Sequence, residues 1–146
     1  MKYNSEDLKP HHGVCAIIKD KQGRILMQDH VKYSFWTIPV GKTTNNQTPE
    51  EALIQEVQEE CGITPTKFRE LTTKSYSYTR NSVEVHLTTH LFDIQEYTGK
   101  IINNEPHKHK EQKFLTVEEI MKLPYISDST VLYLETIGLV REAKLG

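Results

Sequence analysis

The sequence predicts an α+β fold, of the broad α/β class, in which a mixed β-sheet packs against a small number of helices. Apolar runs of strand length occupy the beginning and the middle of the chain, whereas helical signals are confined to three scattered segments. Strands and helices do not alternate regularly, as a doubly wound parallel sheet would require. With 146 residues, the chain is expected to form one domain, residues 1–146, that buries its own core.

Strands are predicted wherever a short apolar run is bounded by turn residues. They fall at residues 13–18, 24–28, 36–38, 68–78, 83–94 and 114–115. The first two are expected to form a hairpin, because Gly23 in the turn at 19–23 can adopt a positive φ. A second turn, at 79–82, is expected to join the two longest strands.

The strongest helix signal begins at Thr48. Thr48 is suited to cap the helix, Pro49 suits its first position, and Glu51 completes a capping box. The helix is expected to end at Cys61, because Gly62 favours the left-handed conformation that follows many helices. Two further helices are expected at residues 116–123 and from 127 or 128 to 140.

Composition narrows the functional class. The net charge of −2 argues against a protein that binds long nucleic acids through their phosphates. No apolar run approaches the roughly 18 residues that cross a bilayer, and residues 1–10 lack the apolar core of a signal peptide. Cys15 and Cys61 lie outside any CxxC motif, so we expect two reduced, buried thiols. These features favour a cytoplasmic protein.

Three glutamates in the first predicted helix are candidate metal ligands. Glu56, Glu59 and Glu60 follow an i, i+3, i+4 spacing, which places them on one helical face. The apolar stripe lies about a third of a turn away and consists of Leu53, Ile54, Val57 and Cys61. Neighbouring carboxylates repel one another, and hard cations such as Mg²⁺ offset that repulsion while bridging substrate phosphates. The cluster is also compatible with a solvated helix face, or with a surface that docks a basic partner protein.

The segment from Gly41 to Ile63 resembles the Nudix box, whose pattern is Gly-x5-Glu-x7-Arg-Glu-U-x-Glu-Glu-x-Gly-U, where U is aliphatic. The spacing is kept without insertion or deletion. The matching positions, seven of the nine specified, are Gly41, Glu56, Val57, Glu59, Glu60, Gly62 and Ile63. Residues 36–42 resemble the family's Trp-x-x-Pro-Gly-Gly-Lys, with Val40 in place of one glycine, and residues 109–120 resemble its EExxWxxxDEL stretch.

This resemblance implies a Nudix-type α/β/α sandwich with a mixed sheet, and a hydrolase that acts on phosphoric anhydride bonds. Its substrate would be a small molecule, a nucleoside diphosphate linked to another moiety, and its cofactor Mg²⁺ or Mn²⁺. By the family pattern, the metal ligands are the backbone carbonyl of Gly41 and the side chains of Glu56, Glu59 and Glu60.

Several residues remain candidates for the base that activates water. Glu56 and Glu60 belong to the box, and Glu111 lies where relatives often supply a further carboxylate from a loop. His107 and His109 share that segment, and some branches of the family use a loop histidine instead.

Two box positions depart from the pattern. Gln47 replaces the family's glutamate and Gln55 replaces its arginine, so the usual salt bridge is absent. Losing the arginine alone would leave an unpaired carboxylate, whereas two amides can hydrogen-bond to each other and to Glu56. We interpret the double change as compensated and expect an active enzyme. The opposing hypothesis is a Nudix module that binds nucleotides without cleaving them.

Candidate substrate-binding residues follow the box. Tyr76 and Tyr78 share one face of a strand with Lys74, and Arg80 follows, so the rings can stack on a base and the arginine can meet a phosphate. Packing of both rings in the core is the alternative. In the family, a tyrosine at the offset of Tyr78 is associated with diadenosine polyphosphate hydrolases. This favours an adenine-containing substrate such as a diadenosine polyphosphate, ADP-ribose or FAD over nucleotide sugars, damaged nucleoside triphosphates or RNA caps. Many relatives are homodimers.

Overall fold

Two β-sheets and three helices form the part of the chain that the computed structural model describes, residues 11–44 and 46–142 without the side chains of Tyr78 and Arg80. The strands are β1 (His11–Ile17), β2 (Ile25–His30), β3 (Phe35–Thr37), β4 (Val40–Lys42), β5 (Ile63–Arg80), β6 (Val83–Gly99) and β7 (His109–Leu115). The helices are α1 (Pro49–Cys61), α2 (Val117–Lys122) and α3 (Asp128–Thr136). The larger sheet has strand order β4–β1–β6–β5, and the smaller has order β3–β2–β7.

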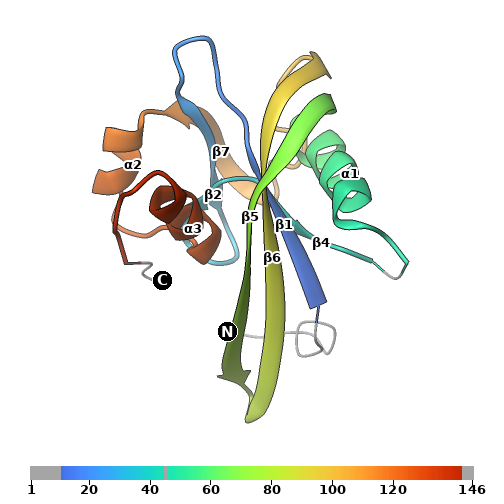
Figure 1. The fold of residues 1–146 in the computed structure, drawn as a ribbon. Coiled ribbons are helices and arrows are strands. Elements are labelled where there is room, and N and C mark those ends of the chain that lie inside the picture. The colour runs from blue at the N-terminus through green and yellow to red at the C-terminus, as the bar shows by residue number, and fades with distance from the viewer. Residues whose placement is uncertain (1–10, 45, 143–146) are drawn as a thin grey trace.

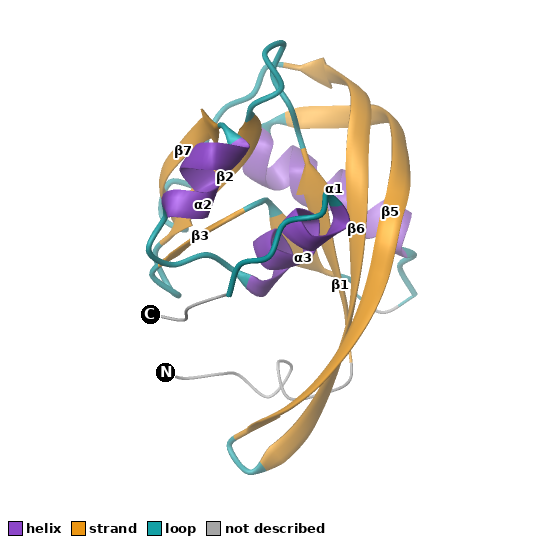
Figure 2. Cartoon of the chain, turned by 60° about the vertical axis from the view of Figure 1, so that its left-hand side comes forward, coloured by secondary structure: helices purple, strands orange, loops and turns teal. Residues whose placement is uncertain are grey.

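The larger sheet is mixed, as predicted. β1 runs parallel to β6, while β4 pairs antiparallel with β1 and β5 pairs antiparallel with β6. Figure 1 shows α1 on one side of this sheet and α2 and α3 on the other. The hairpin of β5 and β6 continues beyond the rest of the sheet as a long curved ribbon (Figure 2). The predicted α/β/α arrangement with a mixed sheet is therefore confirmed.

Strand alternation along β1 divides the core into two clusters. Val14 and Ala16 belong to the cluster that packs under α1, whereas Cys15 and Ile17 belong to the cluster shared with α2 and α3. Both thiols, Cys15 and Cys61, are buried and free, as expected. In the described part of the chain, no helix is long and apolar enough to cross a bilayer.

The predicted hairpin of residues 13–18 and 24–28 is wrong in its pairing. Its turn forms, and Gly23 has φ +79°, but β1 and β2 belong to different sheets. Beside the turn, Leu26 N donates to Ile18 O over 2.9 Å and Lys19 forms an isolated antiparallel bridge with Ile25, while the side chains of the two strands meet in the core. Both hydrogen-bonding edges of β1 are already taken by β4 and β6, so β2 pairs with β3 and β7 instead.

The two long strands extend further than predicted, and β4 is not among the predicted strands. β5 begins at Ile63, directly after α1, and β6 continues to Gly99. Register shifts near Pro65 and Glu70 interrupt their pairing, and such interruptions obscure the alternation that marks a strand. Pro39 directly before β4 suggests a turn by composition.

The predicted ends of α1 are confirmed. Thr48 Oγ1 accepts from Glu51 N over 3.1 Å, and Glu51 Oε1 accepts from Thr48 N over 3.0 Å, which completes the capping box. Gly62 ends the helix with φ 74°. α3 ends at Thr136, earlier than the predicted residue 140, because Gly138 turns the chain with φ +85°.

Gly62 offers a test of how tightly the chain packs at the end of α1. A Cβ at Gly62 would lie 2.8 Å from Cγ1 of Ile102, whereas a Cβ at Gly138 would meet nothing within 4 Å. Both glycines have positive φ, so alanine at either position costs about 1–2 kcal/mol of backbone strain. We predict that Gly62→Ala lowers the free energy of unfolding by about 1 kcal/mol more than Gly138→Ala, measured by urea denaturation. Equal losses would show that Ile102 yields without cost.

Candidate active site

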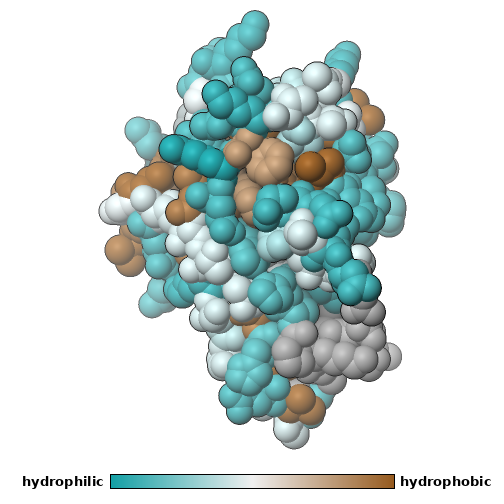
Figure 3. Space-filling view, turned by 45° about the vertical axis from the view of Figure 1, so that its right-hand side comes forward, coloured by the Kyte–Doolittle hydropathy of each residue, from teal (hydrophilic) through white to brown (hydrophobic). Residues whose placement is uncertain are grey.

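The three candidate glutamates of α1 occupy different environments. Glu60 is buried, with 4% of its surface exposed, while Glu56 is partly buried and Glu59 is exposed. All three lie in the C-terminal half of the helix, and its last turn contains no basic residue. The C-terminal end of a helix carries partial negative charge, so carboxylates are disfavoured there. Figure 3 brings the α1 side forward and shows a largely hydrophilic surface around a small apolar area.

Burial and mutual repulsion raise the pKa of two of these carboxyls. Desolvation, followed by the charge of Glu59, raises the pKa of Glu56 to about 7. Desolvation, followed by the charge of Glu56, raises the pKa of Glu60 to about 8. Lys108 opposes both shifts, and Glu105 adds to both. The site therefore has an excess of negative charge that the described side chains only partly neutralise.

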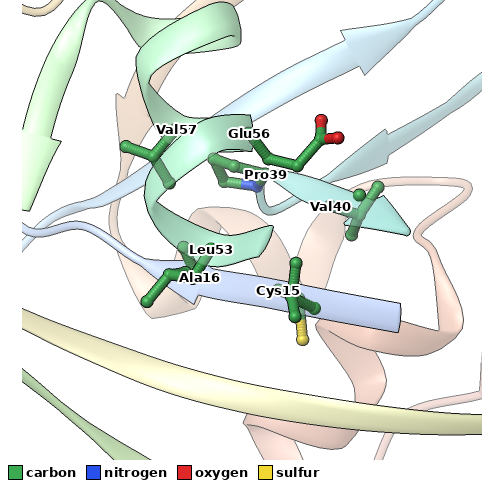
Figure 4. Close-up of a pocket in the computed structure, with 9 residues that line it drawn as sticks. Cys15, Ala16, Pro39, Val40, Leu53, Glu56 and Val57 are labelled. Carbon is green, nitrogen blue, oxygen red and sulfur yellow. The ribbon is translucent and has the colours of Figure 1, made fainter. Parts of the chain in front are cut away.

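Gly41 lets β4 approach α1 closely. A Cβ at Gly41 would overlap with Cγ and Cδ of Glu56, so only glycine leaves room for the glutamate side chain. Figure 4 shows the carboxylate of Glu56 beside Pro39 and Val40, directed away from Leu53. These residues belong to a shallow pocket between α1, β1 and β4. The predicted neighbours Gly41 and Glu56 are therefore in contact.

Glu60 lies against a buried polar group on β2. The Gln28 side chain is fully buried, hydrogen-bonds to Glu60, and donates from Nε2 to Oε1 of Gln112 over 2.9 Å. Oε1 of Glu60 is buried and has no hydrogen-bond partner among the described residues. A buried carboxylate oxygen without a partner is costly, so a donor or a cation from outside the chain would stabilise it.

The segment between β6 and β7 is fastened to the end of α1. Ile102 N donates to Cys61 O and Asn104 N donates to Glu60 O, both over 3.0 Å. Nδ2 of Asn104 also donates to Glu59 O over 2.9 Å. These donors satisfy helix carbonyls that otherwise lack partners, and they bring Glu105 into electrostatic contact with Glu56 and Glu60.

The structure places Glu111 outside this cluster. Glu111 lies on β7 with its side chain half exposed, and its Oε1 pairs with Nζ of Lys113 over 2.8 Å. The further carboxylate near the box glutamates is Glu105, which the sequence analysis does not single out. No motif marks Glu105, because its position depends on how residues 100–108 fold back onto α1.

The two candidate histidines lie in different environments. His107 is exposed, whereas His109 is buried and lies edge-on to His30, with ring centroids 5.6 Å apart. Burial, followed by the charges of His30 and Lys108, lowers the pKa of His109 to about 4. His109 is therefore neutral at physiological pH and buried from solvent.

Comparison with known proteins identifies the family of this site. A model of the NUDIX domain matches residues 9–134. The chain belongs to the Nudix family. The resemblance of residues 41–63 to the Nudix box therefore reflects membership of the family, and the chain is a Nudix hydrolase.

Sequence and structure relatives agree with this assignment. The 8-oxo-dGTP diphosphatase of Proteus vulgaris is 31% identical over 99 residues, which cover 65% of this chain and 85% of that protein. An RNA pyrophosphohydrolase of a Marinomonas species is 32% identical over 62 residues, 42% of this chain and only 37% of that protein. The MutT NUDIX hydrolase of Burkholderia pseudomallei has the same fold, with a TM-score of 0.75, 23% identity, and coverage of 88% of this chain and 98% of that one.

The two glutamines of the Nudix box form a pair, as predicted from their joint replacement. Gln47 Nε2 donates to Gln55 Oε1 over 2.5 Å. Gln55 Nε2 then donates to Glu59 Oε1 over 2.9 Å, so the pair orients Glu59, whereas the sequence suggested Glu56. Gln47 Oε1 accepts from Thr44 N over 3.0 Å, which fixes the other end of the chain of hydrogen bonds.

Of the predicted substrate residues, only the side chain of Tyr76 is described; those of Tyr78 and Arg80 lie outside the described part of the structure. Tyr76 is half-buried beside α3, and burial, followed by the charges of Asp128 and Glu135, raises its pKa to about 12. Lys74 Nζ lies 5.1 Å from the centroid of this ring. The two carboxylates that raise the pKa of Tyr76 therefore belong to α3.

The contact between Gly41 and Glu56 can be tested by comparing two single glycine-to-alanine variants. We predict that Gly41→Ala displaces Glu56 and lowers kcat for nucleotide hydrolysis by about 100-fold or more, because small displacements of catalytic groups are costly. Gly13→Ala on the adjoining strand is the control, since its Cβ would make an ordinary 3.4 Å contact with Leu87. Circular dichroism checks that both variants fold. Equal activities would contradict a role for this contact.

The raised pKa of Glu60 predicts how stability depends on pH. A carboxyl whose pKa rises from 4.5 to about 8 on folding stabilises the protein fully below pH 4.5 and loses that contribution as the pH approaches 8. At pH 8 without metal, Glu60→Gln should therefore be more stable than the wild type by roughly 1–3 kcal/mol, with little difference at pH 4.5. Thermal unfolding at both pH values measures this. Glu118→Gln on exposed α2 is the control, and a pH-independent difference would refute the assignment.

Proposed function

We propose that this chain is a metal-dependent Nudix hydrolase that cleaves a phosphoric anhydride bond in a small nucleotide. The observation that carries the proposal is the pair of interacting carboxyls in the C-terminal half of α1, of which Glu60 is buried and Glu56 is partly buried. Such a pair disfavours the folded chain when it ionises, so it is retained where a cationic ligand offsets the repulsion.

The donor set fits a hard divalent cation. Carboxylate and carbonyl oxygens are the ligands that Mg²⁺ and Mn²⁺ prefer, and Oε1 of Glu60 has no hydrogen-bond partner among the described residues. Within residues 11–44 and 46–142, no group of three or more His, Cys, Asp or Glu side chains is already gathered to hold a metal ion. Glutamate side chains must therefore rotate on binding. When bound, the ion would neutralise the diphosphate and lower the pKa of the attacking water.

We assign roles to the residues from their positions. Gly41, Glu56, Glu59 and Glu60 would hold the metal, with Glu59 oriented by its hydrogen bond from Gln55. Glu105 takes the part that the sequence gives to Glu111, because Glu105 faces Glu56 and Glu60. A carboxylate of this cluster would accept a proton from the attacking water, whose oxygen bonds to phosphorus as the bond from phosphorus to the bridging oxygen breaks and its electron pair leaves with that oxygen.

Lys108 adds a cation at the edge of the same site. It acts electrostatically on both Glu56 and Glu60, and its Nζ lies 3.5 Å from Oε1 of Glu105. Lys108 would therefore be placed to meet the negative phosphates of a bound nucleotide.

A damaged or ordinary nucleoside triphosphate is the substrate best supported by similarity. One relative, matched over 85% of its own length, is by its name an 8-oxo-dGTP diphosphatase. The RNA pyrophosphohydrolase match covers little more than a third of that protein, and the net charge of −2 disfavours long RNA. The preference for adenine-containing dinucleotides depends on Tyr78 and stays a prediction.

A substrate panel tests the proposal. The panel consists of 8-oxo-dGTP, dGTP, ATP, diadenosine tetraphosphate, ADP-ribose and FAD. We expect at least one of them to be hydrolysed with Mg²⁺ or Mn²⁺ and none after the metal is chelated. Chromatography identifies the products. Glu60→Gln should lower kcat by about 10²–10⁴-fold, whereas Glu118→Gln on exposed α2 should not. Failure of the wild type to turn over any nucleotide, with nucleotides still raising its thermal midpoint, would instead support a binding module without catalysis.

A further inference from the structure

Three aromatic rings gather at the turn between β2 and β3. The ring centroids of His30 and Tyr33 lie 4.9 Å apart, those of Tyr33 and Phe35 lie 5.3 Å apart, and those of His30 and Phe35 lie 6.1 Å apart. All three side chains are partly exposed, and Val31 in the same turn is 53% exposed. We call His30, Tyr33 and Phe35 the aromatic platform. Its rings are packed against one another yet remain open to solvent.

The platform lies on the active-site side of the smaller sheet. Gln28, which hydrogen-bonds to Glu60, is two residues before His30 on β2, so both side chains point to the same face. Two residues of strand span about 7 Å. Trp36 points to the opposite face, where Lys113 lies 5.3 Å from the centroid of its ring. His30 of the platform therefore lies two strand residues from the side chain that hydrogen-bonds to Glu60.

Two lysines adjoin the platform. Lys32 Nζ lies 5.1 Å from the centroid of the Tyr33 ring. Lys108 acts on His30 as well as on Glu56 and Glu60, and its carbonyl accepts from Val31 N over 2.9 Å, which joins this turn to the segment that carries Glu105. Lys108 therefore interacts electrostatically both with the carboxylates and with one member of the aromatic platform.

We propose that the aromatic platform holds the nucleobase of the substrate by stacking while its phosphates reach Lys108, Glu56 and Glu60. Lys108 links the carboxylates to the aromatic platform, and a nucleotide likewise joins anionic phosphates to a planar base. Base stacking on aromatic side chains is tolerant of sequence because every base has a π-face. This inference rests on the proposed function, and it makes Tyr33 and Phe35 the residues that contact the base.

Ligands with and without a base separate this role from a structural one. The probes are the α,β-methylene analogue of ATP and inorganic tripolyphosphate, each titrated with Mg²⁺ by calorimetry into the wild type and into Tyr33→Leu and Phe35→Leu. Leucine keeps the apolar bulk and removes the π-face. Tyr97→Leu is the matched control, because Tyr97 is an exposed tyrosine on β6.

The nucleotide analogue should bind Tyr33→Leu or Phe35→Leu roughly 5- to 100-fold more weakly than the wild type, while tripolyphosphate affinity stays the same. Tyr97→Leu should bind both probes like the wild type. Unchanged nucleotide affinity in both platform variants, or an equal loss for both probes, would overturn the proposal. Thermal midpoints show whether a variant is folded. A wild type that binds the analogue in this base-dependent manner but hydrolyses no nucleotide would refute the proposed function and leave the stacking site standing.

Discussion

The close placement of two carboxyl groups at the end of a helix is the constraint on which the surrounding structure depends. Glu60 is buried and Glu56 partly so, at the helix end where the backbone itself is negative. Burial and mutual repulsion raise the pKa of both groups, so ionising them works against folding. Binding of a cation, as proposed for this site, would offset that cost, and the cost without it is an example of the trade between stability and activity.

Three contacts keep this arrangement in place, and each involves the backbone. Gly41 lets β4 pass Glu56 without a clash. Gly62 turns the chain at the end of α1, close against Ile102. Asn104 then satisfies the carbonyls of Glu59 and Glu60 and brings Glu105 toward them. The segment between β6 and β7 is thus part of the site, although it lies some 40 residues beyond the Nudix box in the sequence.

The distribution of charged side chains around the candidate site cannot be read from the net charge of the whole chain. The net charge of −2 excludes little beyond a basic nucleic-acid binder. In the folded chain, Lys108 stands beside the carboxylates and Lys32 beside the Tyr33 ring. The site therefore contains cationic side chains that the net charge of the chain does not reveal. The conversion of the box salt bridge into the Gln47–Gln55 pair leaves this balance unchanged, since two opposite charges disappear together.

The sequence by itself determined what depends on neighbouring residues. The capping box at Thr48, the stop at Gly62 and the spacing of Glu56, Glu59 and Glu60 all act within one helix, where a 3.6-residue repeat decides which side chains share a face. The amide pair between Gln47 and Gln55 could be inferred in the same way, because both lie within reach of the same helix.

The tertiary structure alone decided what depends on distant segments. It separated β1 from β2, because β4 and β6 occupy the edges of β1. It placed Glu105, not Glu111, beside the glutamates, because the hydrogen bonds of Ile102 and Asn104 to α1 determine the path of that segment. It also determined that Glu60 is buried and Glu56 partly buried while Glu59 is exposed, because the rest of the chain packs against only part of the helix surface that carries them. A helical repeat shows which residues share a face, but only the packing of other strands and loops onto that face determines which of them become buried.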